Sequence, residues 1–76
     1  MDFQDPVIKA EVDAILMNKD IWTNDREYMP AWFALIGNLY KRGYSREEIL
    51  QVAMYVSNKR CERLDEYRRE LERLNK

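Results

Sequence analysis

The sequence has no histidine and only one cysteine among its 76 residues. Histidine is the side chain that most often moves protons near neutral pH, and it is the commonest metal ligand, so its absence disfavours catalysis and metal binding. One cysteine excludes an internal disulfide, and a Cys/His zinc site is excluded as well. We therefore expect a non-enzymatic protein with no cofactor and no structural metal.

The chain also lacks a long hydrophobic run and an excess of charge of either sign. No apolar stretch approaches the roughly 18 residues that cross a bilayer, so no membrane segment is expected. With 13 basic and 14 acidic side chains, the net charge of −1 gives no overall attraction to phosphate, which makes a nucleic-acid partner unfavoured. The acidic start does not resemble a secretory signal, and a cytoplasmic location is expected.

What is present is typical of a small globular protein: 46% hydrophobic and 36% charged residues. A chain of this length buries only about 60% of its unfolded surface, so its core alone is marginal. Small domains are usually reinforced by disulfides, metals or oligomerisation. Because the first two are excluded, the sequence predicts association with another chain, most simply as a homodimer.

Asp5 followed by Pro6 marks the start of a first helix, predicted over residues 6–19. Its apolar residues recur at helical spacing: Ile8, Val12, Ile15 and Leu16. The connection that follows is predicted to be irregular or a short helix, because Asn24 and Glu27 have the spacing of a capping box.

A second helix is predicted over residues 30–42, because Pro30 restricts the residue before it. The alternative is one kinked helix from Asp25. Gly43 is the expected stop. The helix has an apolar surface wider than one neighbouring helix would cover, which indicates a central position in the core: Trp32, Phe33, Leu35, Ile36, Leu39 and Tyr40.

Ser45 and Glu48 form a capping box that begins a third helix over residues 45–75, with Tyr44 and Ile49 as a hydrophobic staple. Its first half has core spacing: Ile49, Leu50, Val52, Ala53 and Val56. Such a helix runs roughly 45 Å, about twice the diameter of a compact chain of this size. The predicted fold is therefore all-α, a small three-helix bundle in one domain with an extended C-terminal helix.

The projecting part carries a second apolar stripe at alternating steps of three and four: Leu64, Tyr67, Leu71 and Leu74. Continued backward, this register meets Arg60 and Ser57, so the two stripes of the helix do not join. We interpret the C-terminal stripe as the dimer or partner interface. The alternative is a bend near Ser57 that returns these leucines to their own core.

Aromatic residues outside the densest core spacing supply a candidate target surface, because exposed aromatics are typical interface anchors. These residues are Trp22, Tyr28 and Tyr55. Trp32 and Phe33 are assigned to the core, and Cys61 is interpreted as a packing residue within the third helix.

The leading hypothesis is a small adaptor, inhibitor or regulator that dimerises and binds another protein; its size and character are compatible with a phage or bacterial accessory factor. The alternative is a nucleic-acid-binding regulator that reads DNA with a helix-turn-helix-like hairpin over residues 32–58. Glu47 and Glu48 oppose this alternative, because they lie where phosphates would approach. A third hypothesis is a structural subunit whose long helix is completed by a different chain.

Overall fold

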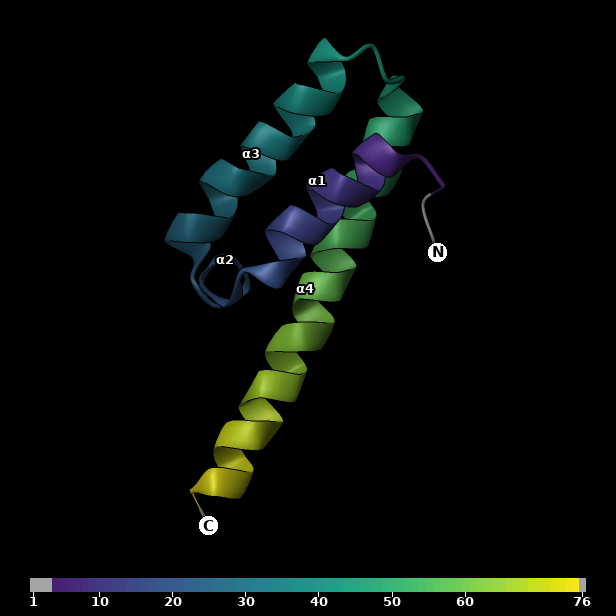
Figure 1. Ribbon diagram of the computed structural model, residues 1–76. Helices are drawn as coiled ribbons and strands as arrows, with labels where there is room; N and C mark the ends of the chain where they lie inside the picture. Colours follow the sequence, from purple (N-terminus) through teal and green to yellow (C-terminus); the bar gives the residue numbers. More distant parts are fainter. Residues whose placement is uncertain (1–3, 76) are drawn as a thin grey trace.

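The computed structural model describes residues 4–75, and the described chain is helical throughout with short connections (Figure 1). Its elements are α1 (Pro6–Met17), α2 (Lys19–Thr23), α3 (Asp25–Lys41) and α4 (Arg46–Leu74). The helices α3 and α4 form an antiparallel hairpin, α1 packs against both of them, and α2 links α1 to α3. The predicted all-α bundle with an extended C-terminal helix is confirmed.

The first helix begins as predicted but ends earlier. The Asp5 carboxylate accepts hydrogen bonds from the backbone N–H groups of Val7 at 2.8 Å and Ile8 at 3.4 Å. At the other end Asn18 adopts an extended backbone, and its side chain accepts from the N–H of Asp20 at 3.0 Å to cap α2. The predicted helix over residues 6–19 is therefore broken at Asn18, because an asparagine caps a new helix more readily than it extends an old one.

The start of the second predicted helix at Pro30 is wrong, and the alternative start at Asp25 is correct. Asn24 caps α3 by accepting from the N–H of Arg26 at 3.0 Å, and Pro30 lies inside the helix. Pro30 is the sixth residue of α3, so the helix lacks the hydrogen bond that an N–H at this position would donate to the Arg26 carbonyl. Burial of Tyr28 against the core holds this first turn in place and outweighs that cost.

The connection between α3 and α4 follows the predicted signals. Gly43 has a φ of 87°, the left-handed conformation that glycine adopts at low cost. Ser45 Oγ accepts from the N–H of Glu48 at 3.2 Å, and Glu48 Oε1 accepts from the N–H of Ser45 at 3.3 Å. From this capping box α4 runs without interruption to Leu74, so the alternative bend near Ser57 does not occur.

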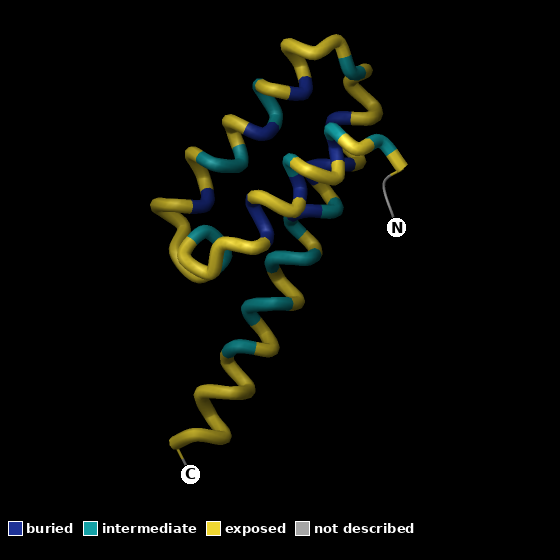
Figure 2. The backbone as a smooth tube through the Cα atoms, viewed as in Figure 1, coloured by how far each residue is buried: buried dark blue, intermediate teal, exposed yellow. Residues whose placement is uncertain are grey.

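The hydrophobic core lies between α1, α3 and α4, where buried residues face one another (Figure 2). Leu39 and Val56 are its most deeply buried members. Burying a side chain of this size contributes about 1.5–3 kcal/mol. The full set of buried apolar residues is Ile8, Val12, Ile15, Leu16, Tyr28, Leu35, Leu39, Ile49, Val52, Ala53 and Val56.

A hydrogen bond of 2.6 Å from the Tyr44 hydroxyl to Asp5 Oδ2 joins the start of α1 to the start of α4. This bond lowers the pKa of the Asp5 carboxyl, with further help from the N–H groups of Val7 and Ile8. The same bond raises the pKa of the Tyr44 phenol. The hairpin loop is thereby fixed to the N-terminal end of the bundle.

The C-terminal end of α4 projects beyond the bundle, as the length argument predicts. The Cα atoms extend over 50 × 25 × 17 Å with a radius of gyration of 13.8 Å, against about 11 Å for a compact chain of this length. Residues 68–75 are all exposed, which Figure 2 shows as an unbroken exposed end of the helix. We call residues 64–74 the α4 extension.

Candidate protein-interaction surface

The stripe predicted as an interface is divided between two environments. Leu64 and Tyr67 are half-buried, whereas Leu71 and Leu74 are exposed. The Tyr67 ring packs edge-on against Trp22, with ring centroids 5.7 Å apart and an interplanar angle of 84°, while Lys19 Nζ lies 4.6 Å from the Tyr67 ring centroid. The first part of the α4 extension therefore contacts the bundle, and only its last turns are open.

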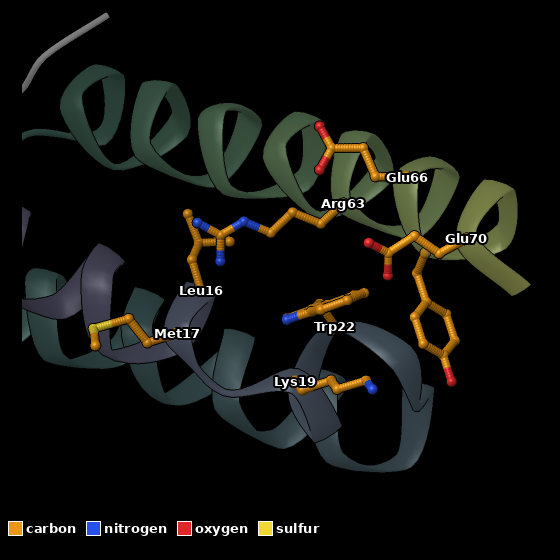
Figure 3. A pocket seen from close by; sticks show the side chains of 8 residues that line it. Leu16, Met17, Lys19, Trp22, Arg63, Glu66 and Glu70 are labelled. Carbon is orange, nitrogen blue, oxygen red and sulfur yellow. The ribbon is translucent and has the colours of Figure 1, made fainter.

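A cleft of about 470 Å³ lies at this junction, between α4 and the segment where α1 meets α2 (Figure 3). In Figure 3 Arg63 reaches from α4 toward Leu16 and Trp22, with Glu66 and Glu70 on the same helix. Its lining residues are Leu16, Met17, Lys19, Trp22, Arg63, Glu66, Tyr67 and Glu70. The cleft contains charges of both signs beside two aromatic rings, and the contact between Trp22 and Tyr67 joins the extension to the bundle.

The three aromatics proposed as a target surface do not share one environment. Tyr28 is only 7% exposed, so its assignment to an exposed target surface is wrong. Arg60 stacks on the Tyr28 ring, with its guanidinium carbon 4.0 Å from the centroid, and the Tyr28 hydroxyl lies 3.3 Å from Ser57 Oγ. Trp22 lies in the cleft, and Tyr55 is half-buried on α4 beneath Lys59.

The exposed apolar surface of the bundle is formed by residues assigned to the core from the sequence. Phe33 is 60% exposed, and Tyr40 and Leu50 are also exposed, so their predicted core positions are wrong. The reason is that α1 covers only one side of the α3–α4 hairpin. Periodicity identified an apolar side chain correctly in each case but did not reveal whether a neighbour covers it.

We call the uncovered side of the hairpin the open face. Its large exposed residues are Met29, Phe33 and Tyr40 on α3 and Leu50 and Met54 on α4. Met29, Phe33 and Tyr40 recur with Ile36 at alternating steps of four and three, which places them along one side of α3. Leu50 and Met54 are one turn apart on α4.

Two grooves run along the open face, and the residues that line them come only from α3, α4 and the loop between them. The first, about 520 Å³, is lined by Phe33, Ile36, Gly37, Tyr40, Tyr44, Arg46 and Ile49. The second, about 230 Å³, is lined by Trp32, Leu50, Ala53, Met54, Ser57 and Asn58. Trp32 and Phe33 separate them, with their rings packed edge to face at 5.4 Å.

The open face is at the upper end of the sizes found for the largest apolar patch on a monomer. Between 44% and 75% of each of its five large side chains is exposed. At about 200 Å² for a whole large side chain, this leaves on the order of 600 Å² of apolar residue surface open. The largest patch on a typical monomer is about 300–600 Å² and is often functional. The open face is therefore large enough to be a binding surface.

Two further features of α3 belong to this face. A Cβ placed on Gly37 would meet no atom within 4 Å outside its own stretch of helix, so no segment of this chain approaches the glycine closely. Trp32 Nε1 is buried without a hydrogen-bond partner among the described residues. The signal in the sequence was the width of the apolar surface on α3, which exceeds what the neighbouring helices cover.

Other candidate sites are weaker. Cys61 is exposed, so its assignment as a packing residue is wrong. Within residues 4–75, no group of three Cys, Asp or Glu side chains is placed to hold a metal ion, and no helix is long and apolar enough to cross a membrane. The first turn of α4 carries Glu47 and Glu48 at the place where a recognition helix would meet phosphates.

The chain was also compared with known proteins. No family model, no curated protein and no solved structure matches it. The open face is therefore identified from the geometry and chemistry of this chain alone.

Proposed function

We propose that this protein is a non-enzymatic interaction module, an adaptor or regulator, that binds an α-helix of another polypeptide on its open face. The observation that carries the proposal is the uncovered apolar side of the α3–α4 hairpin, centred on Phe33, Leu50 and Met54. Two antiparallel helices with a groove between them are a common receptor for an amphipathic helix, which would complete a four-helix arrangement.

The composition of the open face favours a polypeptide partner. Aromatic residues and methionine are enriched at the centre of protein interfaces, and this face contains Phe33, Tyr40, Met29 and Met54. Arg46 is the single charged residue among those that line the two grooves. A nucleic acid would need several cations at that position, so the composition favours a protein helix over DNA or RNA. The single cysteine suits a reducing compartment such as the cytoplasm.

Differential capture from cells of the native host tests the proposal. The tagged chain is compared with the variants Phe33→Glu and Met54→Glu, which place a charge on the open face. The control is Met17→Glu, because Met17 is an exposed methionine on α1, away from the face. We expect at least one protein, or an untagged copy of the chain itself, to be captured by the wild type and the control and lost by both face variants.

The bound partner is then crosslinked and its contact mapped by mass spectrometry. Contacts from a helical segment to Phe33, Leu50 or Met54 support the proposal. Capture that is equal for all variants, or contacts that lie elsewhere on the chain, contradict it.

A further inference from the structure

We propose that the helix bound by the open face is the α4 extension of a second copy of this chain, and that the exchange is reciprocal. In this arrangement two α4 helices pack antiparallel about a two-fold axis that passes between Ser57 and Cys61. The inference rests on the proposed function, because it names the occupant of the same face.

The first support is a row of residues that runs along the uncovered side of α4 from the bundle into the extension. Its members are Leu50, Met54, Ser57, Cys61 and Leu64, and further on Arg68 and Leu71. These positions alternate in steps of four and three, the spacing of a left-handed coiled-coil seam. Leu50, Met54, Cys61 and Leu71 are exposed, and Leu64 is half-buried. One seam therefore joins the open face to the extension.

The second support is the match in length between the extension and the face. Residues 64–74 span roughly 16 Å, and the exposed residues of α3 from Met29 to Tyr40 span about the same distance. With the axis between Ser57 and Cys61, residue 64 of one copy lies opposite residue 54 of the other. The extension then lies opposite α4 from Arg46 to Met54, while Ser57 and Asn58 of the smaller groove lie opposite residues 61 and 60 of the second copy.

The two leucines of the seam match the two grooves. Leu64 and Leu71 are seven residues apart, or about 10.5 Å along the helix. On α4 the smaller groove is centred near Ala53 and Met54, and the larger is lined by Arg46 and Ile49, about seven residues earlier. In the antiparallel pair Leu64 of the second copy meets the smaller groove, and its Leu71 meets the larger one.

The charged member of the seam is accommodated in the same pairing. Arg68 of one copy lies opposite Leu50 of the other, one helical turn from Glu47 of that copy. A long arginine side chain can pack its stem on Leu50 and direct its guanidinium to that carboxylate at the rim. Arg68 now lies 3.8 Å from Asp65 of its own helix, an exposed pair that contributes little by itself.

The area is sufficient for a stable dimer. The open face exposes on the order of 600 Å² of apolar side chain. Leu71 of the extension adds to this, and Leu74 is 81% exposed at its end. Each copy therefore exposes about as much apolar surface as the roughly 800 Å² that a partner buries in a standard interface. Because a two-fold pair presents both surfaces twice, it covers both open faces and both extensions.

The mass in solution is the first test. Analytical ultracentrifugation should give twice the 9.3 kDa of one chain for the wild type. Met54→Glu and Leu71→Glu should each halve the mass, because each places a charge at a buried leucine or methionine contact. The controls Gln51→Glu and Arg69→Glu should keep the dimer, because Gln51 and Arg69 are exposed on the sides of α4 away from the seam. Circular dichroism verifies that every variant remains helical.

Crosslinking at Cys61 tests the direction of pairing. Two Cys61 residues close to the axis should be joined in high yield by a short bismaleimide, and a Cys61→Ser, Gln51→Cys variant should give no covalent dimer. A mass of 9.3 kDa at every concentration overturns the inference. So does a dimer that survives both Met54→Glu and Leu71→Glu, or one that gives no Cys61 crosslink.

Failure of the inference is distinguishable from failure of the proposed function. A monomeric chain whose open face still captures a different protein, with the loss in Phe33→Glu and Met54→Glu described above, overturns only the reciprocal pairing. A monomer that captures nothing through this face overturns both.

Discussion

The two sides of the α3–α4 hairpin are built from the same kinds of residues but have opposite surroundings. Leu39 belongs to the core and is completely buried, while the next residue, Tyr40, is 75% exposed on the open face. On α4 the buried Ile49 is followed by the exposed Leu50. The contrast shows that α1, together with the short α2, covers one side of the hairpin, and that the apolar residues on this side form the core.

The largest expected effect is a difference in protein stability between substitutions of the neighbouring residues Leu39 and Tyr40. Leu39→Ala should lower the free energy of unfolding by about 3 kcal/mol, because it leaves a cavity in the core. Tyr40→Ala should change it by less than about 0.5 kcal/mol in dilute protein, since its ring contacts little. Urea denaturation followed by circular dichroism measures both values. Similar losses for the two variants would mean that the two sides of α3 do not differ as described.

A substitution at Gly37 tests whether the open side of α3 is free of close contacts within the chain. Gly37→Ala should raise the free energy of unfolding of the isolated chain by up to about 1 kcal/mol, because alanine is the better helix former and its Cβ meets no neighbour. The same variant should weaken the binding of any helix that packs closely against α3, because the added methyl group would lie between the two helices. Thermal unfolding of dilute protein, compared with sedimentation at high concentration, measures the two effects separately. Destabilisation of the dilute chain would show that the glycine is not open.

The smallest effect concerns Asp5 and Tyr44, whose hydrogen bond joins the start of α1 to the loop of the hairpin. Because the folded state lowers the pKa of Asp5, the associated stabilisation is present above the ordinary value of 3.8 and is lost as the pH falls through the lowered value. Tyr44→Phe removes the main cause of that shift, so acid should then destabilise the protein less than it does the wild type.

Urea denaturation of the two proteins between about pH 5 and pH 2 measures this difference. Tyr40→Phe is the control, because its phenol lies on the open face and is 75% exposed. An equal loss of stability in Tyr44→Phe and wild type would show that the Asp5 bond does not contribute to the fold.

Local signals in the sequence predicted the starts of α1 and α4 and the stop after α3, but not the end of α1 at Met17. The caps at Asp5 and Ser45 and the stop at Gly43 depend on side chains within a few residues of one another, so they are visible without tertiary structure. The start of α3 was missed because burial of Tyr28 outweighs the local preference imposed by Pro30. Tertiary contacts of this kind lie outside any short window of sequence.

The candidate surface was predicted less well, for a related reason. Phe33 and Leu39 are both large and apolar, and helical spacing places them on different sides of α3 without showing which side a neighbour covers. The packing of α1 makes one exposed and the other buried. The protruding helix could be predicted, because its length follows from counting residues. Within the stripe, Tyr67 packs against Trp22, whereas Leu71 is exposed to solvent. This difference depends on the position of α2, which the sequence pattern does not show.

The continuity of α4 has a geometric consequence for a paired molecule. The helix that packs within the bundle is also the one that would cross to the other copy, so its length would fix the distance between the two bundles. With the axis between Ser57 and Cys61, the two Arg46 residues would lie roughly 40 Å apart along the rod. The Tyr44–Asp5 bond places the beginning of α1 beside each of these ends. Segments joined to the two N-termini would therefore be presented at a fixed spacing and in opposite directions.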